Sequence, residues 1–162
     1  MEEMGRRERI AGIAVDASFL FVALAIGGSL FEHLVLDTAW PDNVRLIQPG
    51  DGGVDRKVFW IPVHVAITVA MLVAAIASWR DRPVRNRVLI GIALYAAMRI
   101  WTGVYFIPEA LSFETLPAMT PEAQEAARTW VRWSPVRSLL LLGSGIALWS
   151  AVVRRRTRAA AH

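Results

Sequence analysis

Cysteine is absent from the 162-residue sequence. A chain without cysteine forms no disulfide and offers no thiolate, either as a nucleophile or as a metal ligand. The sequence has three histidines and no HExxH motif or other regular spacing of metal ligands. It contains no internal repeat, and no low-complexity segment apart from the Arg/Ala-rich C-terminal end. We therefore expect a single domain over residues 1–162.

Formal charge is nearly absent from four long segments. They are 10–36, with Asp16 alone before Glu32; 58–79, with none; 88–107, with Arg99; and 136–153, with Arg137. Each is close to the ~20 residues that an α-helix needs to cross a bilayer. With 55% hydrophobic residues and a mean hydropathy of +0.40, the composition is that of an integral membrane protein. The predicted fold class is all-α, an antiparallel bundle of four transmembrane helices.

The arginines predict how this bundle lies in the membrane. They cluster before the first segment, in the short turn after the second, and after the fourth: Arg6, Arg7, Arg9, Arg80, Arg82, Arg85, Arg87, Arg154, Arg155, Arg156 and Arg158. These positions share one side, which the positive-inside rule makes cytoplasmic. We expect a multi-pass protein of the bacterial inner (plasma) membrane with both termini inside. The pI near 10.6 then reflects topology and anionic lipid, not a nucleic-acid partner.

The two longer loops should contain short helices. Asp42 could begin one on the protein surface over the sequence DNVRLIQ, and Thr120 followed by Pro121 is a helix N-cap with proline at the first position. That second helix should run through Trp133 until Pro135 kinks it or restarts it as the fourth span.

Four ionisable residues should lie in the outer half of the membrane, one from each span: Glu32, His64, Arg99 and Arg137. Intramembrane charges of this kind usually face the bundle interior and mark functional sites. These four are our candidate catalytic residues. The candidate substrate-binding residues are aromatic: Trp60, Tyr95, Trp101, Tyr105 and Trp133. We predict an outward-opening pocket bounded by the four ionisable residues, Tyr95 and Trp133.

Each polar residue also has a structural interpretation. Glu32 could pair with Arg99 or Arg137 to hold helices together, and His64 could hydrogen-bond to a neighbour. His33, close to the membrane surface, should be solvated and without a role. Asp16 should pair with an N-terminal arginine.

Three sequence blocks resemble the anthrone oxygenase-like family of small four-helix membrane proteins. They are GGSLFEHLVLDTAWP (27–41), GVYFIPEALSF (103–113) and WVRWSPVRSLLLL (130–142). The resemblance implies that Glu32, Trp133 and Arg137 occupy the family's polar positions and that Pro108 closes the third helix. Many relatives carry an asparagine after that proline, where this chain has Glu109. The family name rests on fungal enzymes that oxidise anthrones with molecular oxygen.

The function we expect is oxidation of a lipophilic phenol, anthrone or quinol-like molecule, with Glu32 or His64 as base and the two arginines stabilising an anion. No cofactor is favoured. Two alternatives stay open: a non-enzymatic membrane subunit or small-lipophile-binding protein, and a haem or metal protein. Haem would use His33 and His64, and a metal ion could use these with Glu32 and Glu109. Small-residue faces at Gly27-Gly28 and Gly143–Gly145 would also allow a homo-oligomer.

Overall fold

A computed structural model describes residues 2–159 of the chain, with side chains for residues 5–158, and is almost entirely helical. No strand occurs in this described part. Its α-helices are α1 (Glu2–Phe31), α2 (Arg56–Ala77), α3 (Arg82–Trp101), α4 (Ile107–Glu114) and α5 (Pro121–Ala159), and π-helical turns follow α1 (η1, Glu32–Leu36) and α3 (η4, Thr102–Phe106). Four apolar helical stretches are long enough to span a membrane: Gly5–Leu36, Arg56–Ala77, Arg82–Glu114 and Pro121–Arg158. The predicted all-α four-helix membrane fold is therefore confirmed.

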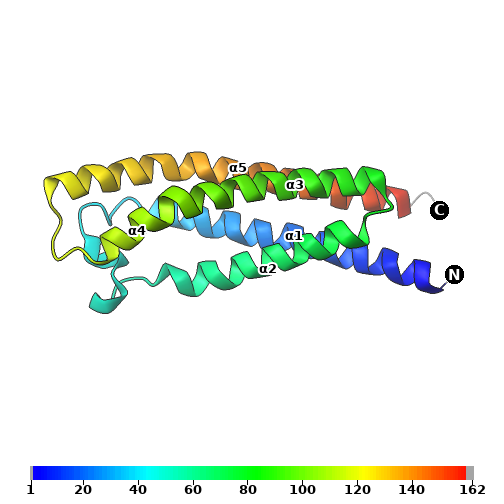
Figure 1. Ribbon diagram of the computed structural model, residues 1–162, viewed down its shortest axis with the longest axis horizontal. Helices are drawn as coiled ribbons and strands as arrows, with labels where there is room; N and C mark the ends of the chain where they lie inside the picture. The colour runs from blue at the N-terminus through cyan, green and yellow to red at the C-terminus, as the bar shows by residue number, and fades with distance from the viewer. Residues whose placement is uncertain (1, 160–162) are drawn as a thin grey trace.

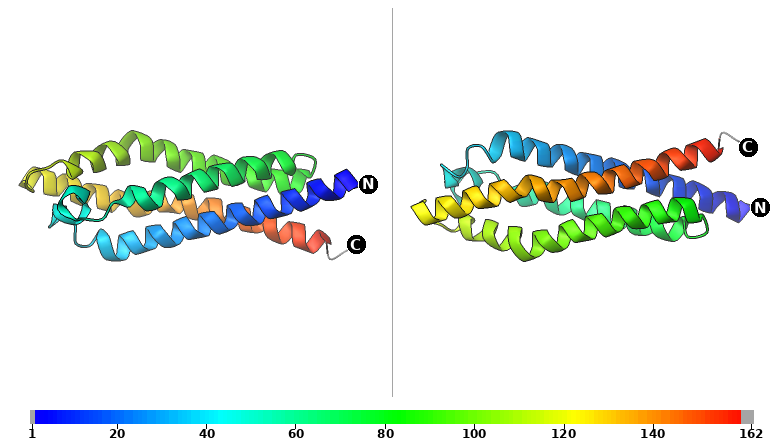
Figure 2. Two further views of the ribbon diagram at one scale, coloured as in Figure 1. Left: turned by 90° about the horizontal axis from the view of Figure 1, so that it is seen from below. Right: turned by 90° about the horizontal axis from the view of Figure 1, so that it is seen from above.

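The four long helices run antiparallel, with both chain ends at one end of the bundle (Figures 1 and 2). We call the opposite end, which carries the two longer loops, the loop end. Helix α5 packs along α3 and α1, and α1 also packs along α2. The contact between α2 and α3 is slighter, and these helices diverge from their shared turn towards the loop end.

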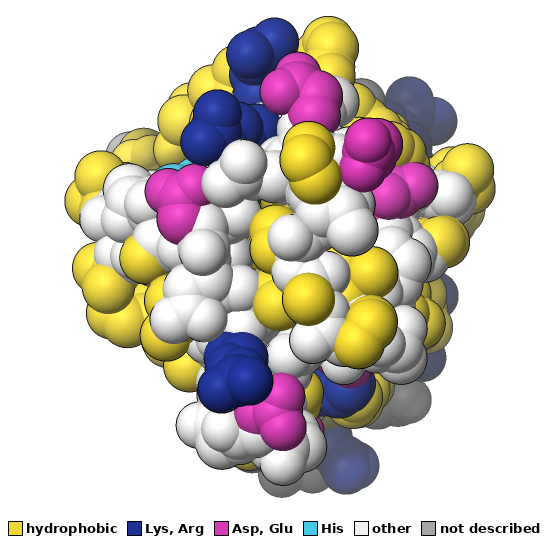
Figure 3. All heavy atoms as spheres, turned by 90° about the vertical axis from the view of Figure 1, so that its left-hand side faces the viewer, with side chains coloured by type: hydrophobic (Ala, Val, Ile, Leu, Met, Phe, Trp, Pro, Cys, Tyr) yellow, Lys and Arg dark blue, Asp and Glu magenta, His cyan; other side chains and the backbone are white. Residues whose placement is uncertain are grey.

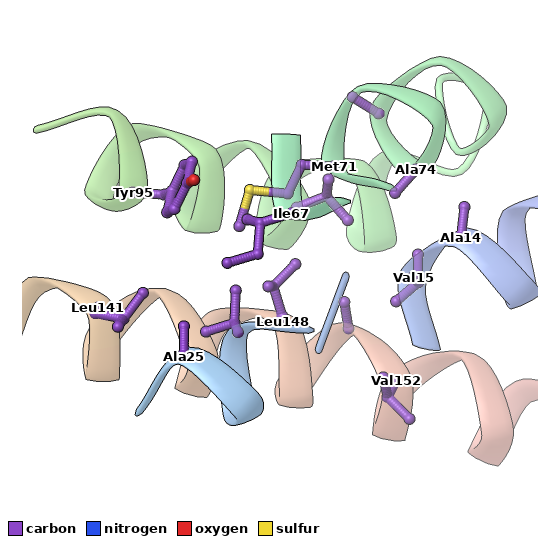
Figure 4. Close-up of a cluster of buried hydrophobic side chains, with 14 of the residues drawn as sticks. Ala14, Val15, Ala25, Ile67, Met71, Ala74, Tyr95, Leu141, Leu148 and Val152 are labelled. Carbon is purple, nitrogen blue, oxygen red and sulfur yellow. The ribbon is translucent and has the colours of Figure 1, made fainter. Parts of the chain in front are cut away.

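The hydrophobic core lies along the bundle axis. Small and branched side chains from α1, α2, α3 and α5 point towards one another there (Figure 4). A second, aromatic core closes the loop end, where Trp40 is fully buried and Trp130 packs edge-on against it. Many large apolar side chains point outward from the bundle, as expected for helices surrounded by lipid. At the terminal end, Asp16 pairs with Arg155 at 2.7 Å, where we had expected an N-terminal arginine.

The loop segments follow their sequence signals in part. The Thr120 hydroxyl accepts the Ala123 N–H at 3.2 Å, which confirms the predicted cap of α5. The short helix after Asp42 is a 3-10 turn, Val44–Ile47, that begins after Asn43. Its expected place on the surface is wrong, because Val44 and Ile47 are buried in the aromatic core.

Both prolines that we expected to interrupt helices lie inside helical stretches. Helix α5 passes through Pro135 without a restart. The third span does not end near Ile107 but continues as α4, so the closing role implied for Pro108 is wrong. In η4 the Ile107 N–H bonds to Thr102 O, five residues back, and Pro108 then falls in the first turn of α4. A proline is tolerated there because the first-turn N–H groups need no helical partner.

Candidate functional site

A cavity of about 610 Å³ lies between the helices towards the loop end. All four predicted catalytic residues line it: Glu32, His64, Arg99 and Arg137. Trp60, one of the predicted substrate-binding residues, lines it as well. One polar side chain from each span therefore reaches the same space, as the sequence predicted.

Glu32 is buried at the start of η1, with 8% of its surface exposed. Its Oε1 accepts a hydrogen bond from the indole N–H of Trp60 on α2 at 2.8 Å. Within the described part of the chain, Glu32 forms no ion pair with Arg99 or Arg137. The structural interpretation of Glu32 as half of a salt bridge is thus replaced by an indole–carboxylate contact between α1 and α2.

His64 is held by its neighbours on one side only. Its Nδ1 lies 2.9 Å from the Tyr95 hydroxyl, and its ring stacks on Trp60 with centroids 5.3 Å apart. The expectation that His64 bonds to a neighbour is confirmed. Among the described residues none hydrogen-bonds to Nε2, so that nitrogen is left for a ligand in the cavity.

Three guanidinium groups line the cavity, and none of them forms an ion pair with a carboxylate among the described residues. Arg137 lies over the ring of Phe106 at 4.4 Å and donates to Ser134 Oγ at 3.2 Å. Arg56 lies over Trp130 at 5.3 Å, and Arg99 makes neither an ion pair nor a side-chain hydrogen bond within the described chain. The sequence did not single out Arg56, because an arginine at the start of a span resembles an interfacial charge. Its place one turn before Trp60 was the available signal.

The cavity is lined by an ion pair at the loop end and by aliphatic side chains elsewhere. Lys57 Nζ lies 2.8 Å from Glu114 Oε2, which ties α2 to α4 at the loop end. Figure 3 shows that this end carries charged side chains of both signs among apolar ones. Exposed aliphatic residues of α2 and of the third span also line the cavity: Ile61, Val65, Val69, Ile107 and Leu111. The cavity therefore opens sideways between α2 and α4, towards the space that lipid would fill.

Four of the predicted aromatic residues do not line this cavity. Tyr95 is buried behind His64, Trp133 is 46% exposed, and Trp101 packs edge-on between Phe106 and Trp133. Tyr105 lines a separate surface depression with Glu109 and Glu122. The predicted pocket boundary is thus wrong at Tyr95 and Trp133. The residues of α5 that line the cavity are Trp130, Arg137, Ser138 and Leu141. Trp133 lies beside this face of α5 and does not line the cavity.

His33 is engaged through both ring nitrogens. Nδ1 lies 2.9 Å from Asp37 Oδ2, and Nε2 lies 2.9 Å from Ser138 Oγ on α5. The expectation of a solvated His33 is wrong, because its side chain is only 16% exposed and bonds to Asp37 and to Ser138 on α5. Haem ligation by His33 and His64 would require His33 to give up one of these contacts. No group of three or more His, Asp or Glu residues able to hold a metal ion occurs in the described part of the chain.

Comparisons with protein-family models, with curated proteins and with solved structures find no match to this chain.

Proposed function

We propose that the protein binds a lipophilic weak acid, such as a phenol, anthrone or quinol-like molecule, and promotes its oxidation by molecular oxygen. The observation that carries the proposal is the cavity itself, which is lined by a carboxylate, an imidazole and three guanidinium groups that form no ion pair among the described residues. A positive cavity at membrane depth favours a ligand that is apolar overall and becomes an anion when it loses one proton.

The chain supplies groups for each part of such a reaction. His64 Nε2 or the free Glu32 oxygen takes a proton from the substrate, and Arg99 and Arg137 stabilise the resulting anion. For an anthrone, the anion gives an electron to oxygen and then forms a C–O bond, which yields a peroxide at the former CH₂ carbon. Loss of the remaining hydrogen from that carbon with cleavage of the O–O bond gives the quinone carbonyl and one water. One oxygen atom ends in the carbonyl and the other in water.

The route to the cavity also fits a lipophilic substrate. The aliphatic side chains of the lateral opening would let such a molecule enter from the bilayer, while Lys57 and Glu114 cover the aqueous side. We further infer from the arginine distribution that the loop end faces the outside of the inner membrane.

A binding protein without chemistry is the second candidate. It is favoured by Trp60, which occupies one oxygen of Glu32 and so leaves less of that carboxylate to act as a base. In this case the arginines and His64 would only hold the anionic ligand.

Oxygen consumption separates the two. Purified protein in lipid nanodiscs would be given anthrone, and uptake would be compared with Glu32→Gln, Arg99→Gln and an Arg132→Gln control on the exposed face of α5. The oxidative proposal expects loss of about 10²-fold or more in the first two variants and none in the control. Uptake by the wild type no faster than in protein-free nanodiscs would leave only the binding function.

A further inference from the structure

We propose that Ser138 is a nucleophile activated by His33 and Asp37, and that it cleaves an ester of a lipophilic molecule bound in the cavity. This activity goes beyond the proposed oxidation and does not depend on it. The proposal rests on one geometric relation: a single imidazole joins a buried carboxylate to a serine hydroxyl, through different ring nitrogens, at 2.9 Å on each side.

The order of atoms in this relay is the one that nucleophilic catalysis needs. Asp37 Oδ2 faces Nδ1 and Ser138 Oγ faces Nε2. An ionised carboxylate only accepts hydrogen bonds, so Nδ1 carries the proton and, in the neutral ring, Nε2 has the free lone pair. In this tautomer Nε2 accepts from the Ser138 hydroxyl, once that hydroxyl turns from the carbonyl of Ser134 to which it also donates. That carbonyl lies farther away, at 3.2 Å. A serine, a base and a group that orients the base form the recognised arrangement for activating a hydroxyl.

The carboxylate is fixed as an orienting group should be. Asp37 is 3% exposed, and its second oxygen accepts the indole N–H of Trp40 at 3.1 Å. Trp40 is itself fully buried in the aromatic core. His33 and Asp37 come from one turn at the end of α1, so their mutual geometry is set locally, and packing of α1 on α5 brings Ser138 to the ring.

Ser138 also lies where a substrate could reach it. It lines the cavity beside Arg137 and Leu141, in the same space that opens to lipid. An acyl chain can lie along the aliphatic side of the cavity with its carbonyl at the polar end. The Arg137 guanidinium lines the same cavity as Ser138 and donates to Ser134 Oγ, one helical turn before Ser138. It is suited to stabilise the oxyanion that forms when the hydroxyl attacks.

The reaction is ester hydrolysis in two steps. Ser138 Oγ bonds to the carbonyl carbon while its proton passes to His33 Nε2, and the ester C–O bond then breaks as His33 gives that proton to the leaving alcohol. Water next attacks the acyl-serine, gives its proton to His33, and releases the carboxylic acid and free Ser138. The acid leaves as an anion from a cavity lined by three guanidinium groups, which can bind a carboxylate.

The test uses an alkyl fluorophosphonate with an octyl chain, which forms a stable bond with an activated serine. Full-length protein in nanodiscs would be incubated with the probe, and the adduct located by peptide mass spectrometry. We expect a single adduct on Ser138 in the wild type. Labelling should fall by about 10²-fold or more in His33→Gln and by a measurable factor in Asp37→Asn. Ser150→Ala, a change of another half-buried serine on α5, should label as the wild type does.

Hydrolysis of 4-nitrophenyl octanoate gives the second readout. Ser138→Ala should abolish turnover. Asp37→Asn should change how the rate of hydrolysis depends on pH, an effect that a merely structural contact would not produce. The wild-type adduct needs no variant, so a misfolded mutant cannot obscure the result. Failure of the probe to modify Ser138, or modification at a rate independent of His33, would show that the three residues only clamp α1 to α5. Anthrone-dependent oxygen uptake would remain a separate question.

Discussion

The indole N–H of Trp60 donates to Oε1 of Glu32 at 2.8 Å, and this contact joins α2 to the end of α1 inside the cavity. It gives a buried carboxylate a neutral partner in place of the arginine that charge pairing would suggest. When a buried acceptor loses its hydrogen-bond donor, the free energy of removing that acceptor from water is no longer compensated.

Trp60→Phe should therefore destabilise the protein by about 1–3 kcal/mol, because the aromatic ring stays while the donor to Glu32 is lost. Thermal unfolding in detergent measures the change. The matched control is Trp79→Phe, since Trp79 is an exposed indole just after α2, with the Arg85 guanidinium over its ring at 5.1 Å. Equal effects of the two changes would show that the hydrogen bond to Glu32 contributes nothing.

Glu32 and Arg99 should behave as independent sites in stability. Because the two side chains form no ion pair, the effects of Glu32→Gln and Arg99→Gln on the free energy of unfolding should add to within about 0.5 kcal/mol in the double variant. The measurement is thermal unfolding of both single variants and the double variant. A double variant that regains most of the lost stability would reveal a salt bridge that the structure does not contain.

Gly27 and Gly28 are neighbours with different surroundings. A Cβ on Gly28 would lie 2.5 Å from a ring carbon of Phe59 on α2, whereas a Cβ on Gly27 would meet nothing within 4 Å. Gly28→Val should thus cost about 1–3 kcal/mol, because the Phe59 ring has to leave its present position between α1 and α2. Gly27→Val, which adds the same side chain to the same helix, should be nearly neutral. Unfolding of the two variants in one detergent compares them directly, and equal losses would contradict the packing.

The cysteine-free chain allows a direct test of orientation. A single cysteine at Gly50, in the first long loop, should react with an impermeant maleimide added to intact cells. A cysteine at Asn86, near the arginine-rich turn between α2 and α3, should react only after the cells are opened. Labelling of the second position from outside would reverse the proposed topology.

Sequence periodicity predicted the helices and the layer of polar residues well. Long runs without charge specify spans by themselves, and Glu32, His64, Arg99 and Arg137 had to face inward because lipid penalises exposed charge. The contacts between helices were harder to predict. Ser138 lies 105 residues after His33, whereas Asp37 is only four residues from that histidine. No local motif such as GxSxG surrounds the serine.

The π-helical turns coincide with two of the points that were missed, the contacts of His33 and the end of the third span. A π turn contains more residues than an α turn, so each one rotates the following side chains away from the face that a period of 3.6 predicts. His33 lies within η1, and η4 leads the third span into α4 past Pro108. Neither turn has a composition that distinguishes it from the α-helix before it.

If the proposed ligand enters through the lateral opening between α2 and α4, its concentration in the bilayer would set how much of it binds. For a ligand that arrives through lipid, the effective concentration is the amount of ligand per amount of lipid, not per litre of water. Most of an apolar compound resides in the bilayer. Adding empty vesicles at fixed protein and ligand should therefore dilute the ligand and weaken apparent binding, although no contact in the cavity has changed. Affinities measured at different lipid-to-protein ratios would agree only after conversion to mole fractions in the membrane.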